Sequence, residues 1–147
     1  MSGHARRRRD SNQGAFRPID YLRAAEHRHA AALWLYDGGL FIDCYYLAGY
    51  VIECALKARI LAAIHLGRRR EAFSEISRGS KMHDHKALTV VLEKSGVRIP
   101  VELSRKLRQF GWTPDLRYRT GKGDPDDSRD FLNLANEILL WAKGVIS

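Results

Sequence analysis

No stretch of this sequence is apolar enough over the roughly 18 residues that a helix needs to cross a bilayer. Charged residues interrupt even the most apolar region, at Asp37, Asp43, Glu53 and Lys57. The charged N-terminus is not followed by an apolar core, so it lacks the pattern of a secretory signal. We therefore expect no membrane contact and a cytoplasmic location.

Cysteine is scarce, with two residues in 147. If Cys44 and Cys54 share one helix, a rise of about 1.5 Å per residue separates them by roughly 15 Å, whereas a disulfide needs Cα atoms within about 7 Å. The alternation of apolar and polar residues that marks strands is also absent, and no segment repeats. These absences exclude a disulfide-built scaffold and a sheet protein, and they favour an all-α fold.

Acidic residues are outnumbered, because 17 Asp and Glu stand against 25 Lys and Arg, for a net charge of +8. Of the 25 basic residues, 18 are Arg, whose forked guanidinium suits phosphate and carboxylate groups. This excess predicts a polyanionic partner such as RNA or a nucleotide. Four consecutive arginines form the candidate nucleic-acid-binding tail: Arg6, Arg7, Arg8 and Arg9.

The distribution of apolar residues predicts one domain. Residues 1–16 are polar and Arg-rich and predict a disordered tail, whereas residues 17–147 predict a helical bundle domain. Helical spacing predicts helices over about 19–36 and 40–66, a third after 83–85, a short fourth from 100, and a last one capped by Asp126, Asp127 or Ser128. The Gly- and Pro-rich segment 111–125 predicts a loop. Together these predict an all-α, antiparallel up-and-down bundle of four to five helices.

Within this bundle the second helix is apolar nearly all round, so we expect it to be the most buried. The other helices have one apolar face each. Residues expected on these inward faces include Leu22, Ala25, Ala32, Leu33, Leu88, Leu92, Val101, Leu107, Phe131, Leu134 and Ile138.

Residues 45–57, YYLAGYVIECALK, contain one acid and one base in an apolar run, Glu53 and Lys57, which a helix places side by side. This segment resembles the second helix of HEPN domains, the small helical modules of prokaryotic toxin–antitoxin and defence systems. The other parts of the family pattern follow in order over about residues 18–145: Arg23-Ala24-Ala25-Glu26 in the first helix, His83 or His85 at the start of a later helix, and Trp112, Leu116, Arg117 and Tyr118 before the last helix.

The resemblance implies a homodimer and a separately encoded nucleotidyltransferase-type partner. Active HEPN domains cut RNA without a metal, using Arg-x4-6-His near the start of the last long helix, but no His follows His85 here. The resemblance therefore implies a non-catalytic module that binds RNA, a nucleotide or a partner protein. One alternative is a metal-independent endoribonuclease with displaced catalytic groups, for which Arg117 and His83 are the candidates. Another is a purely structural protein-interaction domain.

The segment before the last helix supplies most candidate ligand-binding residues. Arg117, Arg119 and Lys122 lie beside Trp112 and Tyr118 in the sequence. Basic side chains interleaved with aromatic rings are typical of proteins that bind single-stranded nucleic acid. This combination predicts phosphate binding together with stacking on a base.

Glu53, Lys57 and His83 complete the candidate set. Glu53 and Lys57 could pair on the surface, line a dimer cleft, or reach across the bundle. We favour the third arrangement, because a largely apolar helix leaves its charged residues few exposed positions. It predicts that Glu53 contacts Arg117 or the region of His83.

We expect neither a metal nor a cofactor. His83 and His85 are two residues apart and do not share a helix face, and no convincing third ligand is adjacent. Asp126, Asp127 and Asp130 have a simpler role in capping the last helix and stabilising its dipole.

Overall fold

The computed structural model describes residues 17–64, 68–76 and 83–146. This part of the chain contains six α-helices, one short 3₁₀-helix and no strand. The predicted all-α helical bundle is confirmed, although these residues form six α-helices where four to five were predicted. The predicted Arg6–Arg9 tail lies outside the described residues.

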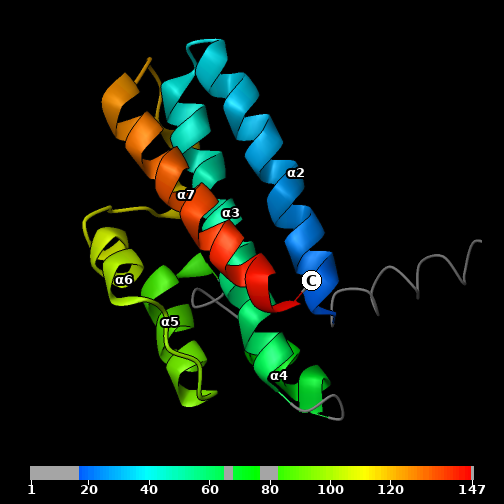
Figure 1. Cartoon of the computed structure of the whole chain (residues 1–147). Helices are drawn as coiled ribbons and strands as arrows, with labels where there is room; N and C mark the ends of the chain where they lie inside the picture. The colour runs from blue at the N-terminus through cyan, green and yellow to red at the C-terminus, as the bar shows by residue number, and fades with distance from the viewer. Residues whose placement is uncertain (1–16, 65–67, 77–82, 147) are drawn as a thin grey trace, which may run out of the picture.

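Three long helices form the centre of the bundle: α2 (Pro18–Asp37), α3 (Phe41–Ala63) and α7 (Pro125–Ile146) (Figure 1). Each packs against the other two. Val51 and Leu56 of α3 have no exposed surface. As its nearly uniform apolar sequence predicts, α3 is the buried axis of the fold.

Helices α2 and α3 form an antiparallel hairpin. The turn between them uses Gly38 and Gly39, and Gly39 has a φ of 79°, which glycine adopts without the strain of a Cβ. The Leu40 N–H donates to the Leu35 carbonyl at 2.9 Å, which closes the turn.

Helix α7 runs in the same direction as α3 (Figure 1). The starts of the two helices are joined, because Ser128 Oγ donates to the Phe41 carbonyl at 3.0 Å. The Ile42 N–H also donates to the Lys122 carbonyl at 3.3 Å. The chain between α3 and α7 must therefore return along the bundle, and this returning segment carries most of the candidate site residues.

Short elements make up the returning segment: α4 (Arg69–Ile76), α5 (His85–Lys94), α6 (Val101–Arg108) and the 3₁₀-helix η3 (Pro114–Tyr118). Helix α5 packs on α3, and α6 packs on α7. Since η3 lies inside 111–125, that segment is not the pure loop that its glycines and prolines predict.

Two helix ends differ from the prediction. Helix α3 ends at Ala63 rather than near Leu66, because Ile64 takes extended backbone angles. The last helix is capped by Asp124 and not by residues 126–128: Asp124 Oδ1 accepts from the Asp126 N–H, and its carbonyl accepts from the Ser128 N–H, both at 3.1 Å. Pro125 has no N–H and suits the first helical position, so the helix begins earlier than predicted.

Two side chains predicted to face inward are exposed. Leu33 is 43% exposed, because the buried face of α2 continues through Ala32. Val101 is 74% exposed, because it is the first residue of α6 and that helix buries only Leu107, near its other end.

Candidate functional site

A buried polar cluster lies at the middle of α3. Lys57 Nζ donates to Glu53 Oε2 at 2.9 Å, and His83 Nδ1 is 2.7 Å from Glu53 Oε1. The Glu53 side chain is 7% exposed and that of Lys57 is 4% exposed. The prediction that Glu53 contacts the region of His83 is confirmed. A carboxylate this buried is tolerable only because both of its oxygens have partners.

Two tyrosines extend this cluster toward the N-terminus of α3. The Tyr46 and Tyr50 hydroxyls are 3.2 Å apart, and the Tyr50 ring meets the His83 ring edge-on, with centroids 5.7 Å apart. Burial and the hydrogen bond to Tyr46 raise the pKa of Tyr50, whereas the charge of Arg117 lowers it. Tyr50 therefore stays protonated near neutral pH and lies within the electrostatic reach of Arg117.

Trp112 fastens the returning segment to α3. Its indole Nε1 donates to the Tyr46 carbonyl at 3.0 Å, and its ring stacks on His85 with centroids 4.8 Å apart and planes 8° apart. His85 Nε2 is 2.9 Å from the carbonyl oxygen of Gly49. A Cβ at Gly49 would lie 1.9 Å from Trp112 Cε2, so only glycine leaves room for the indole. We call Gly49, His85 and Trp112 the indole latch.

Beyond the latch, η3 and the residues after it expose cations and one aromatic ring. Arg117, Tyr118, Arg119 and Lys122 are all exposed, and we call them the basic strip. The Arg117 guanidinium carbon is 4.8 Å from the centroid of the Tyr118 ring, and Tyr118 is 73% exposed. Interaction with Tyr118, and then with Tyr46, raises the pKa of Arg117. The strip therefore presents a fixed positive charge beside an accessible ring.

The structure thus divides the predicted residues into two groups. Glu53 and Lys57 are buried and contact the partly exposed His83, whereas the basic strip lies on the surface. Arg117 contacts an aromatic ring rather than the Glu53 carboxylate. Trp112 is 8% exposed and belongs to the latch, so it is a structural anchor and not an open stacking surface.

Sequence reasoning missed Tyr46, Tyr50, Gly49 and His85 as parts of the site. The signal was present, because positions 46, 50, 53 and 57 follow the spacing of one helix face. A stripe of hydroxyl, carboxylate and ammonium groups on an otherwise apolar helix predicts a polar partner across from it.

Neither a metal centre nor a membrane span is found in the part of the chain that the structure describes. No group of three or more His, Cys, Asp or Glu side chains there is arranged to hold a metal ion. No helix there has the length and apolarity to cross a bilayer.

The acidic residues at the start of α7 repel one another, and the nearby charge of Asp124 is the main reason that the pKa of Asp127 is raised.

Comparison of the chain with protein-family models, with curated proteins and with solved structures finds no match.

Proposed function

We propose that the chain is a non-catalytic, HEPN-like module that binds single-stranded RNA or a nucleotide through the basic strip. The observation that carries the proposal is the pairing of the exposed Tyr118 ring with the Arg117 guanidinium. A ring beside a fixed cation offers a stacking surface for a base and a charge for its phosphate. Arg119 and Lys122 continue the positive charge along the same segment.

The folded core supports this assignment by holding the strip in place. The indole latch fixes the chain just before η3, and the bond from the Ile42 N–H to the Lys122 carbonyl fixes its other end. A segment held at both ends loses little conformational freedom on binding, so more of the contact energy appears as affinity.

The positions of the two histidines support a non-catalytic role. His85 stacks under Trp112 and is held against the Gly49 carbonyl, and burial lowers its pKa. His83 is engaged by the Glu53 carboxylate. Neither histidine belongs to the last helix, where the family that this chain resembles has its catalytic one.

The binding experiment measures fluorescence anisotropy of a labelled oligouridine in the presence of EDTA. Tyr118→Ala removes the stacking surface and is expected to weaken binding by about 1–3 kcal/mol, whereas Tyr118→Phe keeps the ring and most of the affinity. Arg105→Ala is the matched control, because Arg105 is an exposed arginine paired with Glu102 on α6, away from the strip. Equal affinity of all four proteins would contradict the proposal.

One observation favours a second function, metal-independent RNA cleavage. Glu53 holds His83 through Nδ1, so proton transfer would use Nε2, as in other carboxylate-oriented histidine bases. Arg117 acts electrostatically on Tyr50, which contacts His83, so both groups border one cluster. In that function His83 would take the 2′-hydroxyl proton as the 2′-oxygen attacks phosphorus, and Arg117 would stabilise the phosphorane. The P–O5′ bond would then break, leaving a 2′,3′-cyclic phosphate, and the departing 5′-oxygen would take up a proton.

A gel assay in EDTA separates the two functions. Cleavage of the oligouridine by the wild type, lost in both His83→Ala and Arg117→Ala, would establish the ribonuclease and refute the non-catalytic proposal. Binding without cleavage supports the non-catalytic module. If neither occurs, the structural interaction domain becomes the better account.

The remaining partners are proposed from the resemblance alone. We propose a cytoplasmic homodimer that works with a separately encoded nucleotidyltransferase-type protein. Trp34 is 82% exposed on α2 and is the most exposed large apolar side chain of the described residues. Light scattering of the wild type and Trp34→Ser tests the dimer: a monomeric wild type would contradict it.

A further inference from the structure

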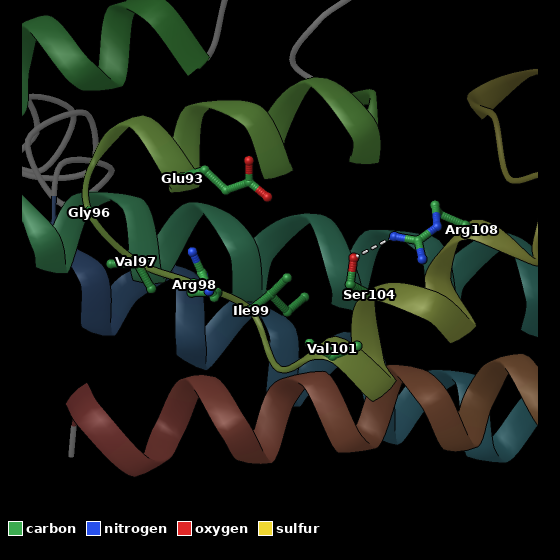
Figure 2. A pocket seen from close by; sticks show the side chains of 8 residues that line it. All are labelled: Glu93, Gly96, Val97, Arg98, Ile99, Val101, Ser104 and Arg108. Carbon is green, nitrogen blue, oxygen red and sulfur yellow. Dashed lines mark hydrogen bonds between the residues drawn. The ribbon is translucent and has the colours of Figure 1, made fainter.

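A groove runs between α5 and α6, and its lining includes Trp112 and Thr113 but none of the four residues of the basic strip. It consists of two hollows of about 520 and 570 Å³. Glu93, Ser104 and Arg108 line both hollows, so the two form one continuous depression. Figure 2 shows its first half, with Glu93 on α5 above, Arg98 on the connecting segment below, and Arg108 on α6 at one end.

The groove exists because its two helices are anchored to different partners. Leu88 and Leu92 fix α5 to α3, whereas Leu107 fixes α6, which packs on α7. The segment 95–100 joins the two helices. The space between the facing sides of α5 and α6 is therefore only partly filled by side chains.

Aliphatic side chains line this groove and stay accessible. Val90 is 50% exposed on α5, and Val101 is 74% exposed on α6. Val97 lies in the connecting segment and also lines the groove. Exposed valines gathered around a concave surface indicate a site that another apolar surface covers.

The charges around the groove favour an acidic partner. Lys86, Arg98 and Arg108 line it, and none of them belongs to an ion pair among the described residues. Of the two carboxylates in the lining, Asp84 accepts from the Lys86 and Ala87 N–H groups and caps α5. The other carboxylate, Glu93, lines both hollows, so the lining has three Lys and Arg against two Asp and Glu. Complementary charge of this kind selects and orients a partner.

The aromatic side chains argue against a nucleic acid in this groove. Binding of single strands relies on accessible ring faces. Trp112 lines the groove but is 8% exposed and is stacked on His85. Phe110 is packed against Tyr45 and Phe131. Aliphatic contacts with a positive rim suit a peptide helix better than a base.

We propose that the α5–α6 groove binds an acidic amphipathic helix of a partner protein. Apolar side chains of that helix at i, i+3 or i+4, and i+7 spacing would contact Val90, Val97 and Val101. Its Asp and Glu residues would face Lys86, Arg98 and Arg108. The ten residues of α5 span about 15 Å, so the groove accommodates two to three turns.

The test uses a fluorescein-labelled synthetic helix with Leu at this spacing and Glu at its other positions, together with a counterpart in which Lys replaces Glu. We expect saturable binding of the Glu peptide, and little binding of the Lys peptide. The double variant Arg98→Glu/Arg108→Glu and the variant Val101→Asp are each expected to weaken binding by about tenfold or more. Arg23→Glu, an exposed change on α2, is the matched control and should bind as the wild type does.

Three results would overturn the proposal: no saturable binding of the Glu peptide, equal binding of both peptides, or unchanged binding in the groove variants. Displacement of the Glu peptide by unlabelled oligouridine would also overturn it, because it would assign the groove to nucleic acid. Tyr118→Ala is expected to bind the peptide normally, so failure of the groove proposal and failure of the proposed RNA-binding function are separate outcomes. Circular dichroism of each variant confirms that it is folded.

Discussion

Replacing Gly49 with alanine tests the packing that holds the basic strip to the bundle. The new Cβ would lie 1.9 Å from Trp112 Cε2, 2.0 Å from Nε1 and 2.3 Å from Cδ2. Atoms cannot approach so closely, so the indole must move away from α3. The bond from the Trp112 indole to the Tyr46 carbonyl and the stack on His85 would then both be lost.

The expected cost can be worked from these losses. The hydrogen bond contributes about 1 kcal/mol, the ring stack about 1 kcal/mol, and repacking of the bulky side chain costs about 2 kcal/mol. Alanine in place of glycine within a helix stabilises the folded state by about 1 kcal/mol. We therefore expect Gly49→Ala to lower the free energy of unfolding by about 3 kcal/mol.

Urea denaturation followed by circular dichroism measures this change. Gly144→Ala is the matched control, because Gly144 is also helical but its added Cβ would meet nothing within 4 Å, so it should be neutral or stabilising. In a Trp112→Ala background the clash is absent, and Gly49→Ala should then stabilise by about 1 kcal/mol. Full stability of Gly49→Ala in the wild-type background would refute the reasoning.

Three further changes test the buried charges. Glu53→Ala leaves the buried Lys57 ammonium without its carboxylate, so the free energy of unfolding in urea should fall by about 3–5 kcal/mol; recovery of most of that loss on adding Lys57→Met would show that the stranded charge is the cause. Burial lowers the pKa of His85, so below about pH 6.5 the imidazole binds a proton more readily in the unfolded chain than in the folded one. The free energy of unfolding should therefore fall with falling pH, by up to about 1.4 kcal/mol per pH unit. His85→Gln should reduce that slope in denaturation curves at several pH values, and an unchanged slope would contradict the assignment. Arg59 is 8% exposed, and its Nη1 has no hydrogen-bond partner among the described residues. Arg59→Met should therefore raise the melting temperature, through a gain in stability of about 1 kcal/mol. A marked fall in the melting temperature would show that the contact of Arg59 with Trp141 stabilises the fold by more than the unpaired Nη1 costs.

Local sequence signals predicted the helices, because the apolar spacing and the terminating residues of a helix lie close together in the sequence. The apolar run around Val51 predicted the buried axis, and Gly38 and Gly39 predicted the end of the first helix. The cap of α7 was misplaced because three acidic residues and a serine near Pro125 compete for that position, and only the backbone geometry selects Asp124. The exposure of Val101 was not predictable, since it depends on how little of α6 meets α7.

The candidate site was predictable only in part. A carboxylate on an apolar helix requires a partner, and that requirement predicted a contact of Glu53 with Arg117 or the region of His83, of which the structure shows the second. The packing of Trp112 against Gly49 brings together residues that are 63 positions apart in the sequence. It depends on the path of the whole returning segment, which no local pattern specifies. Trp112 was accordingly predicted as a stacking residue, whereas the structure makes it an anchor.

The salt dependence of RNA binding tests the central proposal most directly. If Arg117, Arg119 and Lys122 each neutralise one phosphate, the logarithm of the affinity for oligouridine should fall with the logarithm of salt concentration with a slope of about −2. Arg119→Gln should reduce the magnitude of that slope by about 0.7, while Arg105→Ala leaves it unchanged. A slope near zero, or the same slope in the wild type and Arg119→Gln, would contradict binding through the basic strip.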